Sequence, residues 1–360
     1  MKRLIALIFC ASLLWTGCSK SPAPKGPEQF DRYIFFSQQV ESKASLIESA
    51  TAMGQFGVVG FAYPNTTGYD WETVKGDCTP NVFFNDQETE NINVETLQCN
   101  SDGTATYAPL QGWHNSRQYA FFAYYPLNHN NVTLVNADGS TYSRGTPAIL
   151  YSNAGNVKNS MVDVMVAPAL LDKYWVSSSN NNVTYGELAF EFQHCLSSLG
   201  VNLKNSASKD IQVNSVKLAI KGILYEGVRI SLKGPSVLNY TVVSQSNQQL
   251  TYDLTVSHAE KTISPNATGK ELGDKLIFIP QGDQGEVEVT LTLGYRRAVD
   301  DGYGEWTNDY NLQLNPLQTK LNAGKKHIIY INFTETTVDV EVKKEGGAWV
   351  EVDDVHNTFN

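Results

Sequence analysis

Apolar and polar residues alternate with a period of two along most of the chain, and this alternation predicts β-strands. Residues 286–295 show it most clearly, because valine, leucine and tyrosine alternate there with glutamate and threonine. Such a pattern is typical of a half-buried strand of an antiparallel sheet. Residues 58–63 and 119–125 are apolar on both faces and are predicted to be interior strands. Further strands are predicted at residues 213–221, 228–232, 250–256, 275–279, 327–333 and 337–343.

Turn-forming residues separate these strands, as at Asp102-Gly103 and Asp138-Gly139. Helical periodicity is weak and predicts no more than one or two turns near residues 46–53. The spacing of strands and turns therefore predicts an all-β fold built of antiparallel β-sandwiches.

The N-terminus has the pattern of an export signal rather than of a fold element. Lys2 and Arg3 precede an apolar stretch at residues 4–15, which is too short for a permanent membrane-spanning helix. The Thr-Gly-Cys motif that ends at Cys18 resembles a bacterial lipoprotein signal, although Trp15 stands where such signals usually carry leucine. The resemblance implies acylation of Cys18 and a lipid anchor in the outer membrane. An ordinary secretory signal is the alternative.

A polar run, Ser-Ser-Ser-Asn-Asn-Asn at residues 177–182, is either a surface loop or a seam between domains. We place a domain boundary near residue 185, since the length of the chain allows two domains of ordinary size. The expected order of segments is a signal peptide at 1–17, an extended tether at 18–30 and two sandwich domains at 31–185 and 186–360.

Just after this boundary, the apolar residues change from one strand face to the other. Leu188, Phe190 and Phe192 share one face, whereas the apolar residues from Leu199 onward continue on the opposite face. A β-bulge near residues 197–198 would bring both sets to the same side.

Composition limits the classes of partner. Hydrophobic residues make up 41 % of the 360, which is enough to bury a core. Only 18 % of residues are charged, and the formal net charge is −10. A nucleic-acid partner would need a basic face, so this charge excludes that class. It also excludes adhesion to anionic lipid by charge alone.

The five cysteines fit an exported chain. Cys10 leaves with the signal, and Cys18 would carry the lipid. Cys78 and Cys99 are a candidate disulfide, and a bridge that closes a loop of about 20 residues would add roughly 3 kcal/mol. The sequence leaves open whether this bridge forms. Cys195 lies in an apolar strand pattern and is expected to be a buried free thiol.

Several stretches, taken in their order and spacing, resemble the fimbrillin-like family, the lipoprotein subunits of type V pili of Bacteroidia. These stretches are Ile-Phe-Phe-Ser at 34–37, Phe-Gly-Val-Val-Gly-Phe-Ala-Tyr at 56–63, Asp-Val-Met-Val-Ala at 163–167, the phenylalanine- and histidine-containing run at 188–199, Ile-Phe-Ile-Pro-Gln at 277–281 and Asn-Ala-Gly-Lys-Lys at 322–326.

The resemblance implies two transthyretin-like β-sandwich domains in tandem and a role as a pilus subunit. In the family, a lipidated precursor reaches the outer membrane, and a trypsin-like protease specific for Arg or Lys removes its first strand. The emptied groove then accepts a strand from the next subunit of a homo- or heteropolymer. The expected location is the outer membrane and then the fimbrium at the cell surface, with a host or glycan ligand for adhesion.

Two segments fit these roles. The removable strand would be residues 32–40, with Lys43 as the preferred cleavage point and Arg32 as the alternative. A sandwich without this strand would expose unpaired backbone groups, which a donated strand satisfies by β-augmentation. The donor strand would lie within residues 348–359. Its side chains on one face would be Ala348, Val350 and Val352, and Val355 and Phe359 would extend the contact. The alternative is that both segments are ordinary edge strands of a single molecule and are not exchanged.

No residue pattern points to catalysis, a metal or a cofactor. The six histidines form no His-Glu-x-x-His motif, and neither Cys-x-x-Cys nor Gly-x-Ser-x-Gly occurs. His194 shares a strand face with phenylalanines and is expected to be a core histidine. The loop at 300–306 combines acids with aromatics. It would bind Ca²⁺ or a sugar, or else form a hairpin that covers one end of the sandwich.

Two functions remain in competition. The first is a structural fimbrial subunit, and the sequence leaves its position as stalk, tip or anchor open. The second is an outer-membrane glycan-binding lipoprotein, whose platform would be exposed rings such as Trp71, Trp113 and Trp175. These rings are alternatively anchors that pin long loops.

Overall fold

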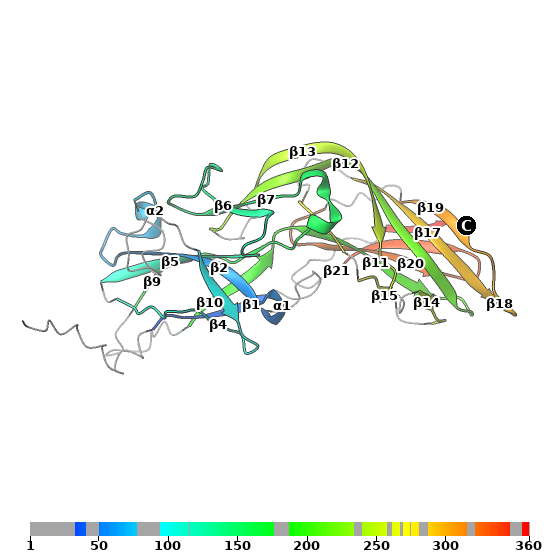
Figure 1. The fold of residues 1–360 in the computed structure, drawn as a ribbon, viewed down its shortest axis with the longest axis horizontal. Helices are drawn as coiled ribbons and strands as arrows, with labels where there is room; N and C mark the ends of the chain where they lie inside the picture. The colour runs from blue at the N-terminus through cyan, green and yellow to red at the C-terminus, as the bar shows by residue number, and fades with distance from the viewer. Residues whose placement is uncertain are drawn as a thin grey trace, which may run out of the picture. The chain divides into compact units, whose positions relative to one another are not determined.

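The computed structural model is almost entirely β-structure, which confirms the predicted all-β class (Figure 1). The compact unit of the chain begins at Ile34. The described residues are 33–40, 50–77, 94–114, 116–175, 187–233, 240–257, 261–266, 269–273, 275–280, 287–314, 321–345 and 355–359. Among them, no helix has the length and apolar character needed to cross a membrane.

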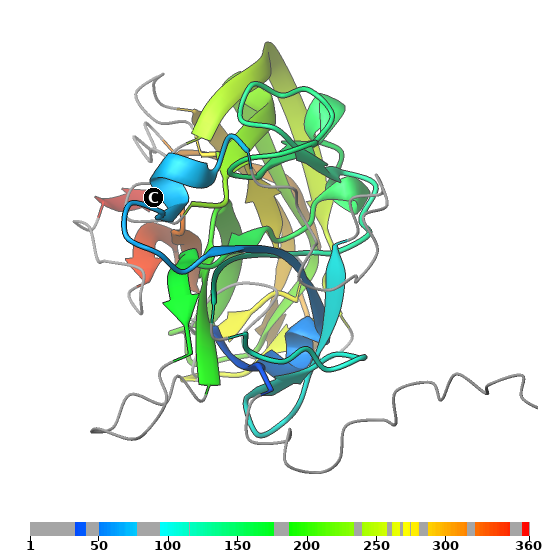
Figure 2. The ribbon, with the colours of Figure 1, turned by 90° about the vertical axis from the view of Figure 1, so that its left-hand side faces the viewer.

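The first sheet closes on itself. Its order is β2-β3-β4-β1-β10-β8-β5-β9, and β2 also pairs with β5, so every strand except β9 belongs to a continuous ring (Figure 2). Its strands are β1 (Phe35–Val40), β2 (Gln55–Pro64), β3 (Glu95–Cys99), β4 (Thr104–Thr106), β5 (Arg117–Tyr125), β8 (Met165–Val166), β9 (Leu170–Tyr174) and β10 (Glu187–His194).

Two further sheets face each other across a second core. One has the order β15-β11-β20-β21-β22, with β16 paired to β11. The other has the order β18-β17-β12-β7-β6, with β13 and β14 paired to β12 and β19 paired to β17. The strands of the first are β11 (Ser197–Asn205), β15 (Lys270–Glu271), β16 (Leu276–Phe278), β20 (Lys326–Phe333), β21 (Val338–Glu345) and β22 (Val355–Phe359). The strands of the second are β6 (Val132–Val135), β7 (Ala148–Ser152), β12 (Ile211–Ser231), β13 (Tyr240–Leu254), β14 (Thr262–Ile263), β17 (Glu288–Val299), β18 (Gly302–Tyr303) and β19 (Thr307–Leu314).

Within the described ranges, helical structure is limited to short turns, as the weak helical periodicity predicts. The α-helices there are α1 (Ala50–Met53) and α2 (Trp71–Val74), and two 3-10 turns occupy Ala154–Asn156 and Lys158–Ser160. Asp70 caps α2, because its side chain accepts a hydrogen bond from the backbone N–H of Thr73 at 2.9 Å.

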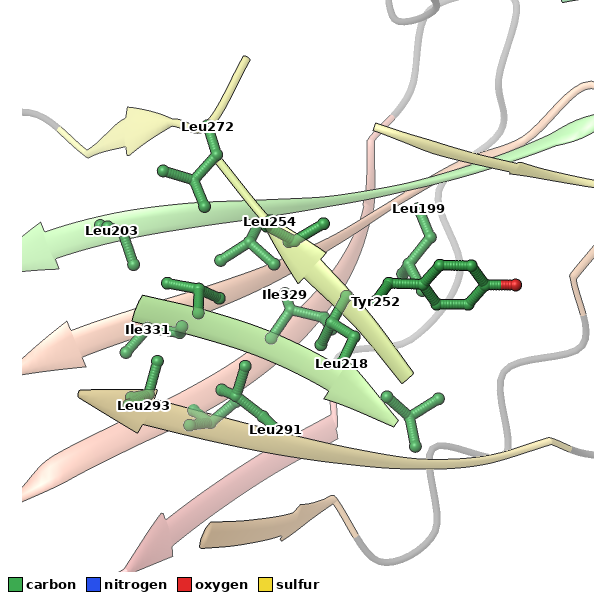
Figure 3. Close-up of a cluster of buried hydrophobic side chains, with 14 of the residues drawn as sticks. Leu199, Leu203, Leu218, Tyr252, Leu254, Leu272, Leu291, Leu293, Ile329 and Ile331 are labelled. Carbon is green, nitrogen blue, oxygen red and sulfur yellow. The ribbon is translucent and has the colours of Figure 1, made fainter. Parts of the chain in front are cut away.

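The buried side chains form three clusters. The largest lies between the two facing sheets, and Figure 3 shows Leu218 of β12, Leu291 of β17 and Ile329 of β20 pointing toward one another. Another cluster lies inside the ring and is rich in phenylalanine. A third contains Phe122 of β5 together with Val228 of β12. The alternating strands therefore bury their apolar faces, as their pattern requires.

The long strand β12 differs from the sequence prediction. The sequence predicts separate strands at 213–221 and 228–232, whereas β12 is continuous over Ile211–Ser231. A bulge around Gly227 shifts its register against β13. Strand β12 buries Leu218 in the largest cluster and Val228 in another, so one continuous strand contributes to two cores.

The predicted bulge near residues 197–198 is also wrong. Strand β10 ends at His194 and β11 begins at Ser197, in a different sheet. The apolar residues change face there because Phe192 packs inside the ring, whereas Leu199 packs in the largest cluster. Sheets combine segments from both sides of residue 185, as in the pairing of β7 with β12. The division at that residue stays a prediction.

Candidate functional site

Strand β1 closes the ring and is paired along both edges. It runs parallel to β10 from Phe35 opposite Glu187 to Val40 opposite Phe192. Its other edge pairs antiparallel with β4 at Phe36 and Ser37. All the other strands of the ring come from residues 55–194, so β1 is the one ring strand contributed by the N-terminal end of the chain.

Two further backbone hydrogen bonds hold β1 to the segment 103–111. The N–H of Ile34 donates to the carbonyl of Gln111, and the N–H of Gln38 donates to the carbonyl of Gly103, both at 2.9 Å. The groove that β1 fills therefore has β10 as one wall and the β4 region as the other.

The side chains of β1 divide between two faces as the alternation predicts. Ile34, Phe36 and Gln38 point inward and are at most 1 % exposed. Phe35 is 47 % exposed, and Gln39 is exposed as well. The strand therefore has one buried face, and its register in the groove is strongly specified.

Phe36 is the centre of an aromatic cluster inside the ring. Its ring stacks on Phe190 of β10 at a centroid distance of 5.4 Å. It meets Phe121 of β5 edge-on at 5.1 Å and Tyr107 at 5.6 Å. Such pairs add to the burial of area, so Phe36 is the main side-chain anchor of β1.

Tyr107 fastens the start of β1 to the groove wall. Its hydroxyl donates to the carbonyl of Ile34 at 2.9 Å and accepts from the N–H of Gln111 at 3.2 Å. Burial raises the pKa of Tyr107 to about 12, so the hydroxyl is neutral and can donate at physiological pH. Tyr107 is not among the residues predicted from the sequence, although its alternation with Ala105 and the flanking threonines is typical of a strand with one buried face.

The C-terminal strand β22 lies on a different sheet of the same chain. It pairs antiparallel with β21, from Val355 opposite Val342 to Phe359 opposite Val338. Strand β22 ends the order β15-β11-β20-β21-β22, and β1 alone fills the groove between β4 and β10. Of the predicted donor residues, Val355 begins β22.

The other predicted processing and donor residues, Cys18, Arg32, Lys43, Ala348, Val350 and Val352, lie outside the described residues. Cys78 does too. Cys99 is half-buried, and burial raises the pKa of its thiol to about 11. Because Cys78 lies outside the described residues, the Cys78–Cys99 bridge stays a prediction. Cys195 is a buried free thiol, as the sequence analysis expects.

The other side chains that were candidates for a chemical role take part in packing and ion-pair contacts instead. His194 is buried, and its Nδ1 lies 3.0 Å from a carboxylate oxygen of Asp163, which matches the expected core histidine. The loop at 300–306 is a hairpin in which the guanidinium of Arg296 lies 4.8 Å from the ring centre of Tyr303 and 4.6 Å from that of Trp306. Within the described ranges, no three His, Cys, Asp or Glu side chains gather closely enough to hold a metal ion.

The described tryptophans form no open stacking platform. Trp71 and Trp113 are buried core residues, and Trp175 packs against the cluster inside the ring. The ring of Trp306 is covered by Arg296. These four rings act as anchors, which is the alternative that the sequence left open.

Comparisons with known proteins agree with this architecture. The fimbrium subunit Fim1C of Phocaeicola vulgatus is 22 % identical over 245 residues, which span 65 % of this chain and 59 % of that protein. The crystal structure of a fimbrial protein from Bacteroides vulgatus has the same fold. It superposes with a TM-score of 0.58 at 19 % identity, covering 87 % of this chain and 99 % of that chain. The family model described as fimbrillin-like matches residues 54–346. Because the match spans most of its length, this chain belongs to the fimbrillin-like family.

Proposed function

We propose that the protein is a structural subunit of a cell-surface fimbria, assembled by exchange of β1 for a strand of another subunit. The observation that carries this proposal is the position of β1. It is the one strand of a closed ring that comes from the N-terminal end of the chain, and it is paired on both edges. Its removal opens a single groove and leaves the order of the other strands unchanged.

The emptied groove would bind an extended strand strongly. Without β1, the edges of β4 and β10 present unpaired N–H and C=O groups. The sites of Ile34 and Phe36 become apolar hollows lined by rings such as Phe190. A donated strand satisfies the backbone groups and fills the hollows with alternate side chains, which is recognition by β-augmentation.

Cleavage by a trypsin-like protease would release β1. Lys43 lies three residues after Val40, the last residue of β1, so a cut there detaches the whole of β1 from the rest of the chain. A cut at Arg32 would leave the strand attached, and Lys43 is therefore the proposed processing site. The two pieces then remain associated only through the contacts of β1 with its groove.

The donor would be the segment 348–359 of a second subunit. In the chain itself, Val355–Phe359 rests on β21 at the end of a sheet. Donation requires this strand to leave β21, after which the segment that contains Ala348, Val350 and Val352 would enter the groove of the next subunit.

The remaining assignments complete the proposal. A lipid on Cys18 holds the precursor in the outer membrane, and the processed subunit moves to the fimbrium. The partners are further subunits, identical or different, with adhesion to a host or glycan ligand as the purpose of the filament. Residues 31–185 and 186–360 would be two transthyretin-like sandwiches in tandem, and we propose no catalytic activity.

The test is assembly of purified chains after limited digestion with trypsin. Mass spectrometry should locate the new N-terminus directly after Lys43. An unheated denaturing gel should show a ladder of SDS-resistant oligomers.

Lys43→Gln should abolish the ladder, whereas Arg32→Gln, the matched control, should keep it. Deletion of residues 348–360 should leave cleavage intact and prevent polymerisation. Cleaved wild-type chains that remain monomeric would refute the proposal.

A further inference from the structure

The buried face of β1 carries one polar residue, Gln38. Its side chain is 1 % exposed, and neither its Nε2 nor its Oε1 has a hydrogen-bond partner. It lies between Phe36 and Val40 on the inward face of the strand, in register with Phe190 of β10. An amide is therefore held in an aromatic environment that offers it no hydrogen bond.

Such a group weakens the strand that carries it. A buried donor or acceptor without a partner has lost its hydrogen bonds to water and gained none in return. The usual penalty corresponds to about a 5- to 150-fold decrease in the equilibrium constant for burial. Most buried polar groups in native proteins avoid this penalty, so one in the middle of an otherwise apolar strand face calls for an explanation.

The neighbouring residue Gln39 shows that a glutamine in this strand does not carry the burial penalty merely by being a glutamine. Gln39 belongs to the same strand, but its side chain points outward and is exposed to water. The penalty therefore belongs to the position of Gln38. An apolar side chain of similar length would occupy the same hollow beside Phe190 without it.

We propose that Gln38 makes β1 a replaceable occupant of its groove, and that the groove favours a strand with an apolar residue at this position. This inference rests on the proposed function. The segment 348–352 of a second copy has the matching pattern, because Ala348, Val350 and Val352 alternate with the spacing of Ile34, Phe36 and Gln38. None of these three side chains is polar, so exchange removes the unpartnered amide.

The unpartnered amide is one thermodynamic contribution to the direction of exchange. The donor carries smaller apolar side chains at the positions of Ile34 and Phe36 and no amide at the position of Gln38. Phe36 gives β1 enough affinity to complete the precursor, and Gln38 lowers that affinity relative to a strand with an apolar residue at the same position.

The first test uses the intact, uncleaved chain and requires no assembly. Amide hydrogen exchange of residues 35–40 reports the local opening of β1. Gln38→Met removes the amide at nearly constant length and should slow this exchange at least fivefold. Gln39→Met, the matched control on the outer face, should leave it within twofold of the wild type. Gln38→Leu provides a second substitution at the same site. Exchange unchanged in both Gln38 variants, or slowed equally in Gln39→Met, would overturn the inference.

The second test measures exchange between subunits. After cleavage, Gln38→Met should form the SDS-resistant ladder at least fivefold more slowly than the wild type, and Gln39→Met at the wild-type rate. Equal rates in all three chains would refute the role of Gln38 in exchange. A wild-type chain that forms no ladder would refute the proposed function instead. The amide exchange of the uncleaved chain would then still decide whether Gln38 weakens β1.

Discussion

The anchoring role of Phe36 gives the sharpest prediction for the free energy of unfolding. Phe36 is 1 % exposed and its ring contacts Tyr107, Phe121 and Phe190. Truncating such a phenylalanine to alanine removes the buried area and leaves a cavity, at a cost of about 3–5 kcal/mol. The lower value already corresponds to about a 150-fold increase in the unfolding constant.

Phe35 is a matched control in the same strand. Its side chain is 47 % exposed, and its backbone pairing with β10 does not depend on the ring. Phe35→Ala should therefore change the free energy of unfolding by less than about 1 kcal/mol. The two substitutions remove identical atoms, so their difference reports the environment alone.

Urea unfolding of the purified intact chain, followed by fluorescence and by circular dichroism, measures both values. The transition of Phe36→Ala should move to clearly lower urea at an unchanged slope, and that of Phe35→Ala should stay near the wild type. In amide exchange, the loss in Phe36→Ala should be largest in residues 35–40. Equal effects of the two substitutions would refute the assignment of β1 as the filler of the groove.

Three further predictions concern single side chains near the ring. Tyr107→Phe should cost about 1 kcal/mol, because the hydroxyl bonds to Ile34 and Gln111 are lost. Since burial raises the pKa of Tyr107 to about 12, its contribution should be complete below pH 10 and disappear as the pH rises toward 12, which wild-type minus variant unfolding curves measure. Cys99, with its pKa raised to about 11, should react with iodoacetamide at pH 8 more slowly than in urea, as mass spectrometry of its peptide reports. Asp163→Ala should lower the free energy of unfolding by about 3 kcal/mol, because buried His194 loses its carboxylate partner, and urea titration tests this.

Local patterns predicted the strands and their faces well. The inward face of β1 and the alternation of β17 follow from the order of residues alone, because each strand buries one side. The pairing of β1 with β10 could not be predicted in this way. It joins segments some 150 residues apart in the sequence, and no local pattern distinguishes a parallel partner from an antiparallel one.

The features of the site that local patterns could not predict also depend on contacts between distant segments of the chain. Gln38 and Gln39 are the same type of residue, and alternation assigns only Gln38 to the buried face of β1. That its amide has no partner depends on the side chains which the ring brings around it. The bond from Tyr107 to Ile34 likewise spans 73 residues. Alternation therefore predicts which face of β1 is buried, whereas the bond from Tyr107 and the unpartnered amide of Gln38 depend on the fold.

The pairing of the groove walls indicates how the ring would keep its other strands if β1 were exchanged as we propose. Strand β4 keeps its pairing with β3 when β1 leaves. Strand β10 keeps its pairing with β8 at its C-terminal end, where His194 also meets Asp163. The chain then continues into β11, which is paired with β20 along its length. The N-terminal part of β10 has β1 as its only ladder partner among the described strands, so this part can adjust to a donor while the rest stays fixed. One wall that keeps its pairing and one that can adjust would suit the strand exchange that we propose.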